Sequence, residues 1–293
     1  MLAVLLALVL QFTAEEAKLS FDTAQTLVEK FTPRDAGTPA GRIAALWLAG
    51  EIASAGARNV QEDVFTATSA LGPMKFTNIC AEFKFSDKGR WTVFLSHYDT
   101  KRGIRCPGAN DGASTSGLLV GVAKMLSAAK GLHGNYLLVW TDGEECIKKY
   151  GVNDGLHGSK RAVEYVKSRG LDVANVICLD MLGDKDLNIE IPANGSPRLT
   201  RIALEAARSI AMPNLVSRSP YCMTDDHEPF LKSGYDAIDL IDFTYGSAPG
   251  ANDYWHTQSD VMKNISVQSL QKSGSLVAAV IKALEKAARD EAH

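Results

Sequence analysis

The apolar segment Tyr136–Trp140 is followed by a Thr-Asp-Gly turn and two adjacent acids, Glu144 and Glu145. A buried strand of this kind delivers the residues after it to the carboxyl edge of a sheet, where open α/β sheets bind ligands. One carboxylate of such a pair can hold a metal while its neighbour moves a proton. Two alternatives exist, because residues 141–144 also fit a helix capping box and glutamates are usually solvent-exposed.

Helix-like and strand-like segments alternate along the 293 residues, and no Pro/Gly/Ser-rich linker divides them. Apolar spacing predicts helices over 21–31, 39–55, 114–129, 159–167, 197–211 and 266–288. Apolar runs predict strands over 60–66, 75–85, 91–95, 136–140, 173–179 and 237–243. Such alternation is typical of a largely parallel or mixed sheet with helices on both faces. The sequence therefore predicts a single-domain α/β protein.

The composition is that of a soluble globular protein, with 46% hydrophobic and 22% charged residues. The net charge of −3 gives no electrostatic footprint for nucleic acid, so no such partner is expected. The run Leu2–Leu10 is continuously apolar but shorter than the roughly 20 residues that span a bilayer, and it suits a secretory signal. We therefore expect a leader over residues 1–17, a folded domain over 18–293, export to the periplasm or beyond the cell, and no membrane span in the mature protein.

The chain has five cysteines, an odd number, and none of them forms a CxxC pair. The pattern indicates neither a disulfide framework nor a zinc knuckle. Cys80 and Cys178 lie within apolar runs, where a cysteine usually packs as a small core residue.

Further acids and an imidazole lie where predicted strands end or predicted helices begin. His97 and Asp99 close a buried strand, and residues two apart at a strand end point the same way. His97 can thus bind a metal that Asp99 supports, the alternative being a structural histidine. Asp111 lies in a Gly/Ala-rich segment that allows close backbone approach, although helix capping also explains it. Asp180 directly follows an apolar run, where capping of a turn is the alternative.

Two more motifs, Asp225–His227 and Trp255–Thr257, lie in the C-terminal part of the chain. An aromatic residue beside a histidine is also compatible with core packing next to a surface imidazole. Together the motifs supply two imidazoles, three carboxylates and one further glutamate. Mixed histidine and carboxylate ligation without thiolate suits a catalytic zinc with an open coordination position. A carboxylate that bridges two metals is a known variant of this arrangement.

In their order along the chain, these motifs resemble the zinc-dependent exopeptidases of metallopeptidase family 28 and the related glutaminyl-peptide cyclotransferases. The resemblance begins at 33–41 and continues to the C-terminal helix. It implies an α/β/α sandwich around a mixed, mostly parallel sheet. It also implies a zinc-exopeptidase-like catalytic domain over 18–293 that acts on peptide or protein N-termini.

The resemblance also implies a set of metal ligands. His97 and Asp180 resemble ligands of one zinc, Glu145 and His256 resemble ligands of another, and Asp111 resembles the ligand that bridges them. In the cyclotransferase branch one zinc suffices, held by Asp111, Glu145 and His256, whereas the aminopeptidases use two.

Other motif residues resemble catalytic and substrate-binding residues of the family. Glu144 resembles the general base and acid, and Asp99 resembles the carboxylate that supports the metal site. In the cyclotransferase branch, Asp180 and Asp225 belong to a proton-handling network with Glu144, and Trp255 lines the substrate pocket.

Finer features favour the cyclotransferase branch. The segment 97–101, the insertion after Glu145, and the motifs 225–230 and 255–257 resemble that branch, whereas residues 110–114 resemble the peptidases at least as well. We therefore expect conversion of N-terminal glutamine to pyroglutamate with release of ammonia. The alternative is an aminopeptidase that hydrolyses the N-terminal peptide bond. A more remote alternative, a non-catalytic binding module on the same fold, would require lost ligands, and every motif position is intact.

Overall fold

A computed structural model describes residues 10–290 and places an eight-stranded sheet at their centre. The strands are β1 (Asn59–Ser69), β2 (Gly72–Phe83), β3 (Trp91–His97), β4 (Asn135–Thr141), β5 (Val173–Asp180), β6 (Ile189–Ile191), β7 (Val216–Arg218) and β8 (Ala237–Ile241). Their order across the sheet is β1-β2-β4-β3-β5-β8-β6-β7. The central strands β4, β3, β5 and β8 run parallel, while β1, β2 and β6 pair antiparallel with their neighbours toward the centre. The predicted mixed, mostly parallel sheet is confirmed.

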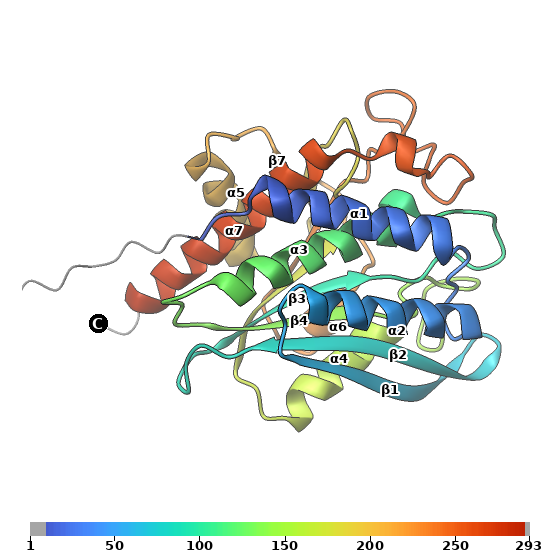
Figure 1. The fold of residues 1–293 in the computed structure, drawn as a ribbon, viewed down its shortest axis with the longest axis horizontal. Coiled ribbons are helices and arrows are strands. Elements are labelled where there is room, and N and C mark those ends of the chain that lie inside the picture. The colour runs from blue at the N-terminus through green and yellow to red at the C-terminus, as the bar shows by residue number, and fades with distance from the viewer. Residues whose placement is uncertain (1–9, 291–293) are drawn as a thin grey trace, which may run out of the picture.

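Helices cover both faces of this sheet and complete an α/β/α sandwich (Figure 1). One face carries α1 (Ala14–Lys30), α2 (Pro39–Ser54), α3 (Thr115–Ala128), α5 (Pro197–Ser209) and α7 (Val267–Asp290). The opposite face carries α4 (His157–Ser168) and the short α6 (Glu228–Lys232). In Figure 1, α1, α3 and α7 lie above the sheet and α4 lies below it.

The central strands β3 and β4 are buried along their whole length. Val93 and Leu95 belong to the core on the side of α4 and α6, whereas Phe94 and Leu138 belong to the core on the side of α3. Because side chains alternate between two covered faces, such strands consist of continuous apolar runs. This burial explains why the strongest strand signals in the sequence are short and contain almost no polar residues.

The first helix begins at Ala14 rather than at residue 21, and Leu10 and Phe12 before it are only 2% exposed. Residues 1–9 of the expected leader lie outside the described residues. Strands β6 and β7, helix α6 and the 3-10 turn η2 (Met262–Asn264) were not predicted, because three to five residues are too few to show a period. None of the helices in residues 10–290 combines the length and apolar character needed to cross a lipid bilayer.

Helices α1 and α3 pack closely because α3 presents a glycine to α1. A Cβ atom built at Gly117 would overlap the backbone carbonyl oxygen of Ser20 in α1. Neither backbone can move far, because the two helices lie against the same side of the sheet. Gly50 in α2 provides a contrast, because a Cβ atom there would meet no atom within 4 Å.

We expect Gly117→Ala to lower the free energy of unfolding. Overpacking typically costs about 1–3 kcal/mol, which exceeds the gain in helix propensity of about 1 kcal/mol. The matched control, Gly50→Ala, should instead stabilise the protein by about 0.5–1 kcal/mol. Urea unfolding of the two variants tests this, and equal stabilisation by both substitutions would contradict the proposed close packing.

Candidate active site

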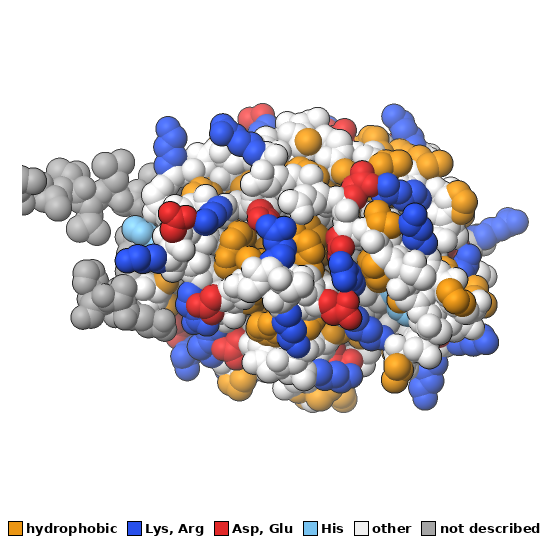
Figure 2. Space-filling model, turned by 90° about the horizontal axis from the view of Figure 1, so that it is seen from below, with side chains coloured by type: hydrophobic (Ala, Val, Ile, Leu, Met, Phe, Trp, Pro, Cys, Tyr) orange, Lys and Arg blue, Asp and Glu red, His pale blue; other side chains and the backbone are white. Residues whose placement is uncertain are grey.

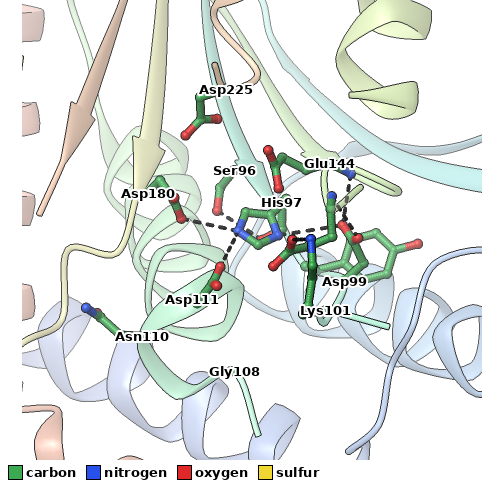
Figure 3. Close-up of polar contacts among 12 residues, drawn as sticks. Ser96, His97, Asp99, Lys101, Gly108, Asn110, Asp111, Glu144, Asp180 and Asp225 are labelled. Atoms are coloured by element: carbon green, nitrogen blue, oxygen red, sulfur yellow. Dashed lines mark hydrogen bonds and ion pairs between the residues drawn. The ribbon is translucent and has the colours of Figure 1, made fainter. Parts of the chain in front are cut away.

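The site lies at the carboxyl edge of the parallel strands, where the sequence places it. His97 is the last residue of β3, Asp180 is the last residue of β5, and Glu144 and Glu145 lie on the turn after β4. The turn segment η1 (Ala109–Ser114) before α3 contributes Asp111. Figure 3 shows the side chains of Asp111 and Asp180 directed at the His97 ring, with Glu144 and Asp225 beyond it.

Asp111 lies between the two imidazoles. Its Oδ1 is 3.1 Å from Nε2 of His97, and its Oδ2 is 3.2 Å from Nε2 of His256. Oδ1 of Asp180 is 3.2 Å from the same His97 nitrogen, and Oε1 of Glu145 is 2.8 Å from the same His256 nitrogen. The structure thus brings together all five residues predicted as metal ligands, in two groups that share Asp111.

Both groups fit a bound cation. The ligand atoms of Asp111, Glu145 and His256 lie within 4.8 Å of one another, as do those of His97, Asp111 and Asp180. Oδ2 of Asp111 is buried and accepts no hydrogen bond, although it lies close to an imidazole nitrogen. Oxygen and imidazole donors without thiolate are the set that zinc and similar divalent ions accept in catalytic sites.

The crowding of buried carboxylates shifts the pKa values of the ionisable groups in the site. Burial raises the pKa of Glu144 well above its usual range, and the charges of Asp225 and Glu145 raise it further. Burial would also raise the pKa of Asp111, but the nearby imidazoles of His256 and His97 outweigh this effect and lower that pKa. Burial would lower the pKa of His256, but Asp111 and Glu145 raise it to about 9. Binding of a metal at this position would require the neutral imidazole and would therefore release this proton.

Asp99 fixes the turn that carries the glutamate pair. Its carboxylate accepts hydrogen bonds from the backbone N–H groups of Glu144, at 3.2 Å, and of Glu145, at 3.3 Å. No helix begins at Thr141, and both glutamates are only 5% exposed. The capping-box and solvent-exposed explanations of this segment are therefore both wrong.

A pocket of about 150 Å³ opens over these residues. Its lining includes Asp225, Trp255 and Phe243. The ring of Trp255 stacks on His256 at 3.8 Å between centroids and meets Phe243 edge-on at 5.0 Å. His256 has a left-handed backbone, with φ of 56°, which is uncommon for a residue with a side chain. The tertiary structure holds this conformation where the aromatic wall meets the ligands.

The loop that carries Asp111 is held by residues far away in the sequence. Asp260 accepts hydrogen bonds from the backbone N–H groups of Asn110, at 2.7 Å, and Asp111, at 3.2 Å. The fully buried Arg34 donates to the carbonyl oxygens of Pro107, Gly108 and Tyr98. Gly112 has φ of 92°, and a Cβ atom there would lie 2.9 Å from the ring of His97. Only glycine therefore allows the loop and the imidazole to approach so closely.

Sequence reasoning missed two residues that contact the glutamate pair. The hydroxyl group of Tyr150 donates a hydrogen bond to Oε1 of Glu144 at 2.9 Å. Nζ of Lys101 lies 3.2 Å from Oε2 of Glu145. Tyr150 belongs to the insertion after Glu145, and Lys101 closes the segment that begins at His97, so proximity to a predicted motif was the available signal.

Comparison with known proteins decides the family. Residues 78–281, which make up most of the chain, match the family model described as Peptidase family M28. The chain belongs to peptidase family M28. This confirms the resemblance drawn from the ordered motifs.

The proteins similar to this M28 chain include glutaminyl cyclases as well as an aminopeptidase. The crystal structure of a glutaminyl cyclase from an Acidobacteriales bacterium is 28% identical, with a TM-score of 0.86 over 98% of this chain and 99% of that chain. A glutaminyl-peptide cyclotransferase-like protein of Bos taurus is 25% identical over 75% of this chain and 63% of its own length. An aminopeptidase of Bacillus subtilis is 28% identical over 65% of this chain and 40% of its own length. The chain thus spans less than two thirds of these curated relatives.

We expect a divalent cation to stabilise the M28 domain, because coordination would replace repulsion among buried carboxylates. Titration of Zn²⁺ into chelator-treated protein should raise the free energy of unfolding by about 2.7 kcal/mol at a hundredfold excess over the dissociation constant. His256→Ala should lose most of this increase, whereas His133→Ala, an exposed histidine outside the cluster, should keep it. Thermal unfolding with and without metal measures the effect, and an undiminished increase in His256→Ala would contradict the assigned site.

Proposed function

We propose that this chain is a zinc-dependent glutaminyl-peptide cyclotransferase, which converts the N-terminal glutamine of a peptide or protein to pyroglutamate and releases ammonia. The observation that carries the proposal is the small pocket in which Glu144 lies beside Asp111, Glu145 and His256, with Trp255 in its wall. Similarity over nearly the whole chain to a glutaminyl cyclase structure supports the proposal. So does similarity to a cyclotransferase-like protein of Bos taurus.

The proposed zinc ligands are Asp111, Glu145 and His256. Three protein ligands leave an open coordination position, which is the arrangement of catalytic zinc. Bound there, zinc would polarise the γ-carbonyl group of the glutamine substrate. In this proposal His97 keeps its contacts with Asp111 and Asp180 and orients the ligand loop.

The proposed reaction requires one proton to move. The α-amine nitrogen forms a bond to Cδ, the carbonyl carbon of the side-chain amide, the bond from Cδ to the amide nitrogen breaks, and that nitrogen leaves as ammonia. Glu144 suits the transfer from the amine to the departing nitrogen, because burial raises its pKa and makes its carboxylate a stronger base. Tyr150 donates to Oε1 of Glu144 and leaves Oε2 for the substrate amine.

The remaining pocket residues support this chemistry. Burial raises the pKa of Asp225 and of Asp180. We therefore propose that these two carboxyl groups hold protons next to Glu144. Trp255 and Phe243 form an apolar wall that limits access of water, which would otherwise compete with the amine for the carbonyl carbon.

One observation favours a second candidate, a zinc aminopeptidase. His97, Asp111 and Asp180 form another group able to hold a cation, and it shares Asp111 with the first. Two metals bridged by one carboxylate would allow hydrolysis of the N-terminal peptide bond, with Glu144 taking a proton from the attacking water. Similarity to an aminopeptidase of Bacillus subtilis is compatible with this alternative.

We expect Glu144→Gln to retain the metal but to lower kcat by about 10²–10⁴-fold, because the amide cannot carry the proton. The matched control is Glu205→Gln, the same change at an exposed position of α5, which should leave turnover unaltered. Ammonia release from a Gln-initiated peptide and zinc content of each variant should be measured together. Turnover near the normal rate in a metal-loaded Glu144→Gln variant would rule out the assigned role.

The two candidate functions differ in product and in metal requirement. A cyclotransferase should reduce the mass of a Gln-initiated peptide by one ammonia and reach full activity at one zinc per chain. An aminopeptidase should release free leucine from a Leu-initiated peptide and need two zincs, because it requires the His97–Asp111–Asp180 group as well. Mass spectrometry during zinc titration distinguishes them. Release of leucine without cyclisation of the Gln peptide would replace the proposed function by the alternative.

A further inference from the structure

A second hollow of about 670 Å³ adjoins the active-site pocket. It lies between α4, α6 and the loop 150–156, and it shares Tyr150 and Thr224 with the pocket. We refer to it as the α4–α6 groove. Figure 2 views the molecule from the side of α4 and shows exposed apolar side chains among alternating positive and negative ones.

The sizes of the two hollows differ in a way that matters for a peptide substrate. The active-site pocket measures about 150 Å³, which is room for a single amino-acid side chain and not for the chain that follows it. A peptide with its first residue in the pocket must therefore leave through an opening in the pocket wall. Tyr150 and Thr224 belong to both linings, so these two residues form the boundary between the pocket and the groove.

Apolar side chains set the character of the groove. Val152 at the loop tip is 89% exposed, an unusual position for a β-branched apolar residue. Leu156, Val163 and Pro229 contribute further apolar surface to the lining. An exposed apolar hollow that continues a binding pocket is typical of a surface for ligand or peptide contacts.

The charged residues in the lining of the groove, two lysines and two glutamates, balance in number. Nζ of Lys160 donates to the carbonyl oxygens of Gly151 and Gly155, both at 2.8 Å, and so fixes the loop. Lys232 forms an ion pair with Glu228 at 3.0 Å. Because positive and negative side chains are equal in number, the groove has no strong preference for a charged ligand, and apolar contact decides what binds.

We propose that the α4–α6 groove binds the second and third residues of the peptide substrate and favours apolar side chains at these positions. The inference rests on the proposed action at peptide N-termini and adds a substrate class to it. Tyr150 forms the junction, because its ring lines both hollows while its hydroxyl group holds Glu144. Burial of one apolar side chain is worth about 1.5–3 kcal/mol, which corresponds to roughly tenfold or more in kcat/KM.

Three substrates test the proposal with the full-length, zinc-loaded enzyme: glutamine amide, Gln-Phe-Leu-amide and Gln-Ser-Ser-amide. The wild-type enzyme should process the apolar peptide with a kcat/KM about tenfold above that of the serine peptide. Glutamine amide does not reach the groove and serves as the internal reference. The difference between the peptides should appear mainly in KM, because the groove lies outside the reacting atoms.

Two exposed positions allow the groove to be altered without disturbing the core. Ser233→Trp places a large ring in the groove, and Val152→Ser removes apolar surface from the loop tip. Both should raise KM for Gln-Phe-Leu-amide and leave the kinetics of glutamine amide as they are. The matched control is Leu71→Ser, which removes from the β1–β2 turn an exposed apolar side chain that lines neither the pocket nor the groove, and should change the kinetics of neither substrate.

The outcomes separate the groove from the reaction itself. If wild-type enzyme cyclises glutamine amide but processes both peptides equally, and neither groove variant alters that ratio, the groove assignment fails while the proposed function stands. If glutamine amide and both peptides are all left uncyclised, the proposed function fails, and the groove assignment fails with it. A selective loss on the apolar peptide in Ser233→Trp supports the groove.

Discussion

The crowding of buried carboxylates around two imidazoles is the constraint on which the rest of this structure depends. Asp99, Asp111, Glu144 and Glu145 are at most 5% exposed, and burying several like charges together is costly. Imidazole protons, the ion pair of Lys101 with Glu145 and the nearby Arg34 compensate for part of this charge. A bound divalent cation would compensate for much of the remainder. Repulsion among buried carboxylates is thus greatest at the proposed active site, and active sites are commonly destabilised in this way.

The parallel centre of the sheet makes such crowding feasible. Neighbouring strands β4, β3 and β5 deliver Glu144, His97 and Asp180 to one edge, and covering helices anchor the strands on both faces. The Asp111 loop, by contrast, has no strand to fix it and depends on Asp260 and Arg34. The rigid sheet positions one set of ligands, and buried hydrogen bonds from remote segments position the other.

Tyr150 links the proposed chemistry to the proposed choice of substrate. Its hydroxyl group contacts Glu144, and the same residue forms the boundary between the pocket and the α4–α6 groove. The loop that carries it is fastened by Lys160, which donates to backbone carbonyl groups rather than to a carboxylate. A peptide in the groove would therefore contact the residue that orients the proposed base.

The sequence by itself determined the sheet, its main helices and the residues that gather at its edge, because apolar runs and the acids that end them are local patterns. It did not determine how neighbouring acids divide their roles: Asp225 lines the pocket, whereas the adjacent Asp226 turns away and accepts a hydrogen bond from Thr141. Nor did it indicate Tyr150, or the support that Asp260 gives to the Asp111 loop. These contacts join residues that are far apart in the chain or that lie on irregular loops. Only tertiary packing determines which of these residues meet. Short elements such as β6, β7 and α6 were settled in the same way, since packing rather than periodicity holds them in place.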